Sequence, residues 1–246
     1  MRTKKRGWHG SLVFSLFALA LGMAASSWAE EKEPLTSTAA TADEKKIVLR
    51  RLLPNAPLWI DEARTRAVMV GKVCLRQGQL EMFACPEGTK EHESVLSVPV
   101  EAEKVHAALV GVWAEPGRPV QFVPEYRPAT GTEIDVSLYW TDESGQRRSA
   151  WAQDWVQNAH TGKALNKPWV FAGSSFWVDE KTGKQDYLAN HGELICVSNF
   201  SSAMLDLPIQ SSADAGQLLF NAYTERIPPL DTKVTIVLTP KVAKKP

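Results

Sequence analysis

The densest group of chemically capable side chains in the sequence lies between Cys85 and Ser94. Thiolate and imidazole are common protein ligands of zinc and copper, and carboxylates complete or support such sites. This stretch carries one thiol, one imidazole and three carboxylates: Cys85, His92, Glu87, Glu91 and Glu93. We therefore expect a transition-metal or ligand site here. Cys85 and His92 would be central, and Glu91 and Glu93 would be oxygen ligands or supports of the ligands.

Two further side chains could complete a four-ligand set. His191 lies in a predicted turn, and Cys196 lies in the apolar run that follows it. The spacing matches no zinc pattern, because the sequence has neither Cys-x-x-Cys nor His-Glu-x-x-His. A solvated polar loop with one hydrogen-bonded histidine is therefore the alternative. An iron–sulfur cluster is not expected, because its usual four thiolates exceed the three cysteines of the chain.

The pairing of the cysteines depends on a predicted hairpin. Apolar stretches flank residues 77–78, and a two-residue turn there places Cys74 opposite Glu81. Cys85 then lies about 13 Å further along the strand, whereas a disulfide needs Cα atoms within about 7 Å. The hairpin thus disfavours a Cys74–Cys85 disulfide. Cys196 could pair with either cysteine or remain a buried thiol.

The sequence leaves three classes of function open. A non-catalytic binding or accessory domain is expected first, because the sequence has no Gly-x-Ser-x-Gly elbow and no glycine-rich phosphate loop. A thiol- or metal-assisted enzyme is an alternative, with Cys85 and His92 as a conceivable dyad. The other alternative is a cell-wall glycan-binding module that uses exposed aromatic rings. Five tryptophans lie close together in the sequence: Trp140, Trp151, Trp155, Trp169 and Trp177.

The elements that must position these residues are mainly strands. Residues 134–140 alternate apolar and polar side chains, which is typical of a half-buried strand. Residues 101–113 repeat apolar side chains at spacings of three and four, which predicts one amphipathic helix. A second, shorter helix is expected over 152–159. Because strands outnumber helices and do not alternate regularly with them, we expect a β-rich α+β domain with a largely antiparallel sheet or sandwich.

The N-terminus has the layout of a secretory signal peptide. A basic segment precedes an apolar one, and the small residues Ser27 and Ala29 predict cleavage after residue 29. We expect export by a Sec-type pathway to the periplasm or the extracellular space, with no transmembrane segment in the mature chain. The expected parts are a signal peptide (1–29), a flexible leader (30–50), a single globular domain (51–240) and a frayed tail (241–246).

The net charge of the chain restricts the kinds of macromolecule that it is expected to bind. The chain has 28 basic and 28 acidic side chains, and four of the basic ones lie in the predicted signal peptide. The exported part therefore carries a small net negative charge, which argues against a general nucleic-acid binder. A protein or glycan of the cell envelope is the expected kind of partner.

Several stretches resemble one known family, the YdjY-like domain of exported bacterial proteins. The resemblance covers roughly residues 66–240, and its most specific stretches are Lys90-Glu91-His92-Glu93-Ser94 and Trp169-Val170-Phe171-Ala172-Gly173-Ser174. Further similar stretches are Gly71-Lys72-Val73, Gly117-Arg118-Pro119-Val120 and Ile227-Pro228-Pro229. The resemblance implies a domain of unknown function, and it assigns no catalytic residue.

Overall fold

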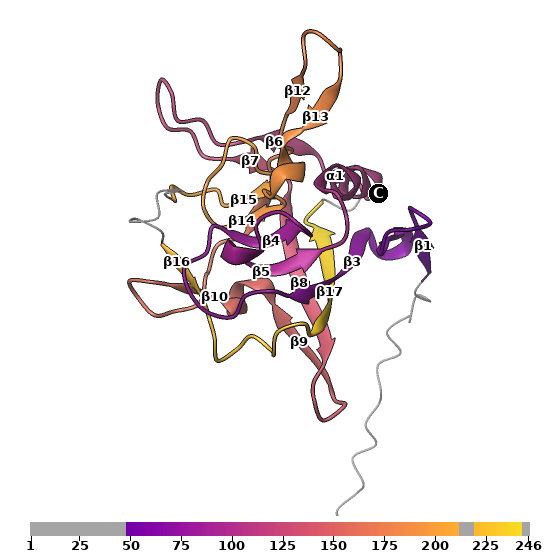
Figure 1. The fold of residues 1–246 in the computed structure, drawn as a ribbon, viewed down its shortest axis with the longest axis vertical. Helices are drawn as coiled ribbons and strands as arrows, with labels where there is room; N and C mark the ends of the chain where they lie inside the picture. The colour runs from indigo at the N-terminus through magenta and orange to yellow at the C-terminus, as the bar shows by residue number, and fades with distance from the viewer. Residues whose placement is uncertain (1–47, 212–218, 243–246) are drawn as a thin grey trace, which may run out of the picture. The chain divides into compact units, whose positions relative to one another are not determined.

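The structure is a computed structural model that describes residues 48–211 and 219–242 (Figure 1). The predicted signal peptide and most of the predicted leader lie outside the described residues. The end of that leader is a strand, β1 (Leu49–Arg51). Lys241, which was expected in the frayed tail, donates its backbone N–H to the carbonyl of Glu133, and its ammonium lies 3.1 Å from Asp135. The rest of that tail, from residue 243, is not described.

Eight strands of the described residues form a closed ring, called the ring below. Each strand is hydrogen-bonded to the next, and the last pairs with the first because β5 also pairs with β3. In ring order they are β3 (Arg66–Val73), β17 (Lys233–Pro240), β8 (Glu133–Thr141), β11 (Trp169–Phe171), β15 (Leu205–Asp206), β14 (Ile195–Cys196), β4 (Met82–Pro86) and β5 (Ser94–Val98). The expectation of a β-rich, largely antiparallel fold is confirmed, but the sheet closes on itself where an open sheet or sandwich was expected.

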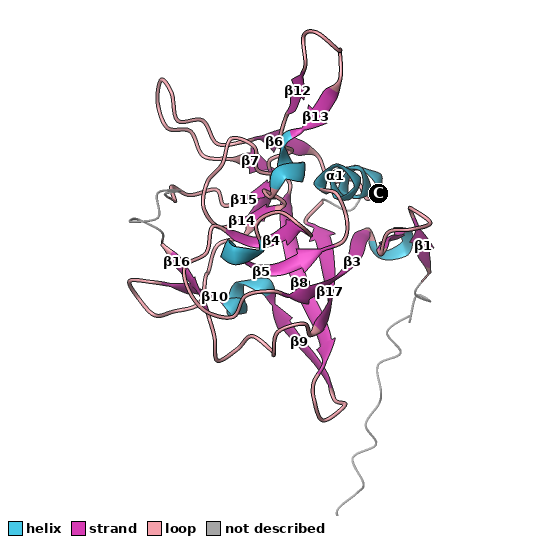
Figure 2. Cartoon of the chain, viewed as in Figure 1, coloured by secondary structure: helices cyan, strands magenta, loops and turns pink. Residues whose placement is uncertain are grey.

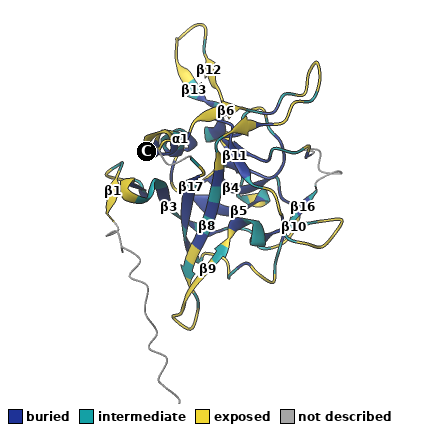
Figure 3. Ribbon diagram, turned by 180° about the vertical axis from the view of Figure 1, so that it is seen from behind, coloured by how far each residue is buried: buried dark blue, intermediate teal, exposed yellow. Residues whose placement is uncertain are grey.

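The longest ring strands follow the predicted alternation. In β8 the side chains of Ile134, Val136 and Leu138 are fully buried, and their neighbours along the strand are not. Leu138 pairs with Ile236 of β17, which is also fully buried. Inward-facing apolar side chains therefore meet inside the ring and form its core, which Figure 3 shows as buried ribbon along β3, β8 and β17.

The remaining strands lie on or beside the ring. β2 (Leu58–Asp61) and β1 extend the sheet beyond β3, and β9 (Arg147–Trp151) pairs with β8. Three two-stranded sheets are separate from it. They are β6 (Pro116–Arg118) with β7 (Thr130–Gly131), β10 (Val156–Asn158) with β16 (Phe220–Ala222), and β12 (Phe176–Val178) with β13 (Gln185–Tyr187).

One of the two predicted helices is confirmed. α1 (Ala102–Gly111) buries Ala102, Val105, Ala108 and Leu109 (Figure 2). The second predicted helix is wrong: its residues form a 3-10 turn, η3 (Ala152–Trp155), followed by β10. Strand pairing of β10 with β16 satisfies the backbone groups that a helix would have used. The described residues contain no helix long and apolar enough to cross a membrane.

The predicted hairpin around residues 77–78 is also wrong. The backbone of this stretch bonds to β16 instead, since Leu80 N–H donates to Phe220 and Ala222 N–H donates to Gly78. β3 and β4 are therefore not paired with each other, and β5 lies between them in the ring. The predicted separation of Cys74 from Cys85 depended on this hairpin and is therefore no longer supported.

Candidate functional site

The stretch from Cys85 to Ser94 connects two parallel strands. Met82 at the start of β4 is level with Ser94 at the start of β5, so the chain must return along the whole of β4 before β5 begins. Residues 87–93 make this return and include one 3-10 turn, η2 (Glu91–Glu93). Parallel strands usually need a dozen or more connecting residues. A connection this short stays close to the strand that it passes, and all five residues of β4 are buried.

One lysine and three glutamates meet at this connection and are called the loop cluster below. The Lys90 ammonium lies 3.0 Å from Glu193, 3.6 Å from Glu93 and 3.9 Å from Glu81. It also lies 4.7 Å from the centre of the Phe200 ring, close enough for a cation–π contact. These side chains come from the connection, from the residue before β4 and from the residues before and after β14. Lys90 therefore joins parts of the chain that are far apart in sequence.

Burial and charge shift the pKa values of this cluster. Burial raises the pKa of the Glu81 carboxyl, and the neighbouring Glu93 carboxylate raises it further. Burial alone would lower the pKa of Lys90, but its carboxylate partners outweigh burial and raise it. Lys90 is therefore a permanent cation at neutral pH, shared by three carboxyl groups.

The two central residues of the predicted metal site do not share an environment. Cys85 is fully buried in β4, whereas the His92 side chain is 77% exposed on η2. His92 Nε2 is 3.8 Å from the Glu93 carboxylate. Glu91 accepts a hydrogen bond from the backbone N–H of Gly88, so it closes the turn of the connection.

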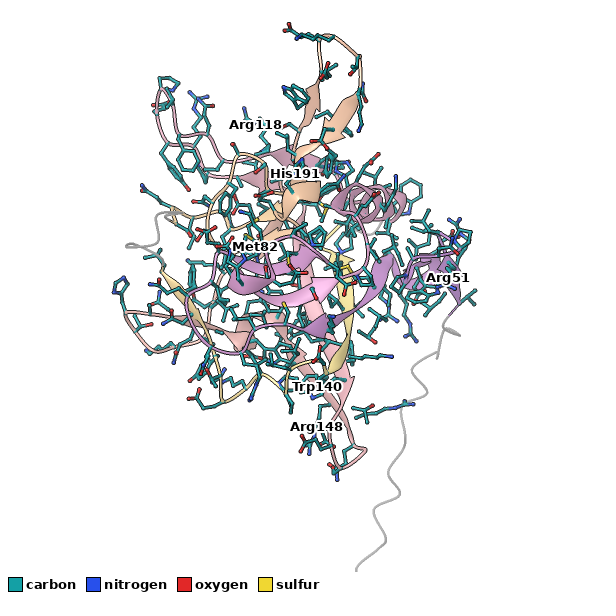
Figure 4. The ribbon with its side chains drawn as sticks, in the orientation of Figure 1. Arg51, Met82, Arg118, Trp140, Arg148 and His191 are labelled. Carbon is teal, nitrogen blue, oxygen red and sulfur yellow. The ribbon has the colours of Figure 1, made fainter. Side chains whose placement is uncertain are left out.

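The other two predicted ligands lie elsewhere. His191, at the end of η4 (Leu188–His191), pairs with Asp186 at 2.6 Å, and its side chain is 64% exposed. Cys196 is fully buried beside Met82 and Ala203, and burial raises the pKa of its thiol. Figure 4 shows His191 and Met82 at different levels of the molecule. Among the described residues, no three His, Cys, Asp or Glu side chains are grouped to hold a metal ion.

Cys74 is the side chain that the structure places beside Cys85. It directly follows β3, and its thiol donates a hydrogen bond of 3.0 Å to the backbone carbonyl of Ser94. Interaction with Cys85 raises the pKa of the Cys74 thiol, and burial raises it further. Cys74, which follows β3, and Cys85, in β4, thus lie on either side of β5.

A different region exposes apolar side chains on two projections. The loop arm is residues 119–129, between β6 and β7, and the hairpin arm is residues 174–188, which include β12 and β13 (Figure 1). All three side chains of β12 are about half exposed: Phe176 (51%), Trp177 (54%) and Val178 (48%). On the loop arm, Phe122 is 50% and Val123 is 80% exposed.

The two arms begin at one place. A Cβ atom on Gly173, at the base of the hairpin arm, would lie 2.8 Å from the side chain of Pro116, where β6 begins. Gly173 also has φ +91°, a backbone conformation that glycine adopts most easily. A glycine at position 173 therefore allows the base of the hairpin arm to contact the base of the loop arm. Figure 4 labels one residue at each base, Arg118 and His191.

Hydrogen bonds fix each arm to the body of the domain. Tyr187 of β13 donates from its hydroxyl to the Gly173 carbonyl at 2.9 Å, and the same hydroxyl is 2.8 Å from His106 Nδ1 on α1. Burial lowers the pKa of His106, so this imidazole is neutral at pH 7. On the loop arm, Tyr126 bonds to the Asn199 side chain at 3.3 Å, and Asn199 in turn donates to Asp206 of β15.

Comparison with known protein families decides the relationship that the sequence suggested. The family model described as the YdjY domain matches residues 58–239, which is more than half of the chain. This chain belongs to the YdjY domain family. The match includes the whole ring except Pro240. No curated protein and no solved structure matched the chain in the same comparisons.

The two specific family-like stretches have different places in this YdjY domain. Residues 90–94 supply Lys90, Glu93 and the start of β5, so they build the connection and its cluster. Residues 169–174 form β11 and the turn through Gly173 from which the hairpin arm leaves the ring. Each stretch thus determines the position of one of the two regions described above.

Sequence reasoning missed most partners of the site residues in this YdjY domain. It did not place Cys74 beside Cys85, and it gave no role to Lys90, Glu81 or Glu193. No local pattern connects these residues, because ring closure brings them together. The basic Lys90 among acidic neighbours was the one available signal, since a buried cation requires nearby carboxylates.

Proposed function

We propose that this YdjY domain is an exported, non-catalytic binding domain of the cell envelope that contacts a partner protein through its two arms. The N-terminal sequence pattern supports export. The observation that carries the binding role is the row of half-exposed apolar side chains on β12. Apolar patches that remain exposed on a folded domain commonly mark interaction sites.

The form of the hairpin arm supports a protein partner. Successive strand residues point to opposite faces, so Phe176 and Val178 lie on one face of β12 and Trp177 lies on the other. The core of the ring covers neither face completely. A partner that packs on both sides would bury aromatic surface of the kind that dominates protein interfaces.

The anchoring of the arm supports the same role. Tyr187 is 2% exposed, and its ring packs 5.0 Å from that of Phe176. The arm is thus fixed at its base by Tyr187 and exposed further out. A rigid arm loses little conformational entropy when a partner binds it.

The exposed tryptophans favour a protein over a glycan. Trp113, Trp151 and Trp177 are each more than half exposed, but they follow α1, end β9 and lie in β12, respectively. A sugar-binding platform needs rings that face one ligand. The apolar neighbours of Trp177 are Phe176 and Val178, which form a continuous apolar strand of the kind that packs in a protein interface.

A photo-cross-linking experiment tests this proposal. The full chain is produced with benzoylphenylalanine in place of Trp177, and separately in place of Trp151, in cells of the native host. The two tryptophans are matched in exposure, at 54% and 53%. We expect one protein adduct of defined mass from position 177 and none from position 151. The double variant Phe176→Ser, Trp177→Ser should abolish co-purification of the same protein.

Two results would contradict the proposal. Equal adduct patterns from positions 177 and 151 would show that β12 is no more a contact surface than β9. Sedimentation with purified cell wall that is lost in Trp177→Ser would assign the arm to a glycan instead. Circular dichroism of each variant checks that loss of binding does not follow from loss of folding.

A further inference from the structure

One edge of the hairpin arm pairs with no other strand of the described chain. β12 pairs with β13 on one side only, with Trp177 level with Asp186. Next to this pair, Leu188 N–H donates to the Ser175 carbonyl. Hydrogen-bonded pairs alternate along an antiparallel ladder, so Trp177, two residues after Ser175, turns its backbone groups towards β13. The residues on either side of Trp177 therefore turn theirs towards the open edge.

This open edge carries no charge. Exposed edges are usually protected by charged side chains or proline, because they can pair with other chains. The edges of the large sheet follow this rule, since β1 contains Arg50 and Arg51 and β9 contains Arg147 and Arg148. β13 contains Asp186. β12 contains only Phe, Trp and Val, and Figure 3 shows it as exposed ribbon on the hairpin arm.

The backbone of this edge is complementary to itself. When two copies of β12 meet about a two-fold axis at Trp177, antiparallel pairing places Phe176 of one copy level with Val178 of the other. The backbone groups of both residues already point towards the open edge, so each such pair can exchange two hydrogen bonds. The pairing of β12 with β13 needs no change.

The side chains match in the same register. The two Trp177 rings lie directly opposite each other at the axis, in a non-hydrogen-bonded pair, where side chains of two strands come closest. On the other face, Phe176 and Val178 of both copies form one apolar patch. Tyr187 extends this patch, because its ring packs 5.0 Å from that of Phe176.

Charge distinguishes this edge from the other three. A two-fold pairing of β13 about Asp186 places two carboxylates opposite each other, and like charges in such positions destabilise a sheet. Self-pairing of β1 or β9 brings together the arginines of two copies. Of these four edges, β12 alone brings no like charges together, so a second copy of the chain fits it.

We propose that two copies of this domain pair through β12, so that their hairpin arms form one antiparallel sheet with the strand order β13, β12, β12, β13. This inference rests on the proposed binding role of the arms, and it names a second copy of the chain as a protein bound there. The paired strands have three residues each. The interface is therefore small, and the dimer is expected to be reversible.

A proline tests the backbone pairing. Val178→Pro removes an N–H that points away from β13, so it retains the hydrogen bonds within the arm. Val178→Ala is the matched control, because it removes more apolar surface than proline does and retains the N–H. In sedimentation equilibrium at up to about 1 mM, the Kd range of weak complexes, the full chain should approach twice its monomer mass. Val178→Ala should still dimerise, and Val178→Pro should remain a monomer.

A cysteine tests the register. Trp177→Cys places two cysteines opposite each other at the axis, with Cα atoms about 4.5 Å apart, within the range of a disulfide. Trp151→Cys on β9 is the control, because the two tryptophans are 54% and 53% exposed. After mild oxidation and peptide mapping, we expect a disulfide that joins position 177 of two chains and no such link at position 151.

Three results would overturn this inference. They are a monomer over the whole concentration range, equal dimerisation of Val178→Pro and Val178→Ala, and equal linkage at positions 177 and 151. Near-ultraviolet circular dichroism shows whether Val178→Pro is folded. If it is not, the comparison of Trp177→Cys with Trp151→Cys decides the question without it.

The binding role of the arm is tested separately, by the photo-cross-linker at position 177. A monomeric chain that is cross-linked there to a different protein loses the dimer and keeps the binding role. A chain that is cross-linked there to no protein, its own copy included, loses both. An adduct of twice the mass of the chain supports both.

Discussion

The loop cluster and the arms place their side chains in opposite ways. At the loop cluster, charged and polar side chains are drawn inward, and Lys90 contacts three carboxylates that are mostly shielded from water. On the hairpin arm, apolar side chains are held outward, and Phe176, Trp177 and Val178 are each about half exposed. Both arrangements oppose the usual tendency of polar groups to stay exposed and apolar groups to be buried.

Removing a side chain should therefore have different consequences in the two regions. Inward polar groups must find partners in the ring, so their removal should change stability and its pH dependence. Outward apolar groups have few partners in the ring, so their removal should change binding and leave stability almost unaltered. Substitutions in the two regions test this division.

The largest effect is expected from Asp206, the buried carboxyl of the ring. Burial raises its pKa to about 7, and its Oδ2 atom has no hydrogen-bond partner among the described residues. The pKa of Asp206 in the folded state exceeds its value in the unfolded state, so the protonated carboxyl stabilises the fold fully at about pH 4 and below. This stabilisation, as much as about 4 kcal/mol, is lost as the pH rises through 7. Asp206→Asn should flatten this fall, and urea unfolding at pH 5 and pH 8 measures it. Parallel pH curves for both proteins would contradict the assignment.

Removing the shared cation should have the next largest effect. Lys90→Met leaves Glu81, Glu93 and Glu193 without a counter-charge and should cost about 2 kcal/mol at pH 7, below the 3–5 kcal/mol of a fully buried pair because water reaches the site. Repulsion by the neighbouring carboxylates already raises the pKa of Glu81, and without Lys90 nothing opposes it, so the deficit in stability should shrink as pH falls towards 4. Lys104→Met, in an exposed pair with Glu103, is the control. Equal losses in both variants would refute the role of Lys90.

A smaller effect should separate the base of the hairpin arm from its surface. Tyr187→Phe removes the hydroxyl that contacts Gly173 and His106 and should cost about 1 kcal/mol. Hydrogen exchange should rise first in β12 and β13, because this hydroxyl fixes them to the ring. Tyr139→Phe, on an exposed position of β8, should change neither stability nor exchange. Uniform acceleration over the ring would show that Tyr187 is a general core residue.

The smallest effect on stability is expected on the arm surface. Trp177→Ser should change the free energy of unfolding by less than about 0.5 kcal/mol, as is usual for exposed positions. Trp155→Ser, at a fully buried tryptophan that packs 5.2 Å from the ring of Trp140, should cost several kcal/mol. Thermal melts of the two variants give the contrast directly. A loss above about 2 kcal/mol for Trp177→Ser would place this ring in the core of the domain.

Local patterns predicted those parts of the fold that local forces determine. The alternation in residues 134–140 and the apolar stripe of α1 both identify real elements, because one face of each is buried in the core. Residues 152–159 failed as a helix because their backbone partners are in β16, more than 60 residues away. The turn at Gly78 failed as a hairpin for the same reason.

The candidate sites divide in the same way. The sequence identified the Cys85–Ser94 stretch as chemically dense, and the structure places the loop cluster there. It could not identify the partners, because Cys74 and Glu193 reach the stretch only through closure of β3 on β5 and pairing of β14 with β4. The sequence also could not predict that Trp177 is exposed, since buried and exposed tryptophans have the same local sequence signals.

The place of β17 in the ring determines when the other strands can pair during synthesis. β17 is the last strand along the described chain, yet it lies between β3 and β8, which are made much earlier. A chain that emerges from its N-terminus therefore holds β3 and β8 with unpaired edges until residues 233–240 arrive. Such edges are open to pairing with other chains. A product that stops before Lys233 would keep both edges unpaired and is therefore expected to aggregate or to be degraded.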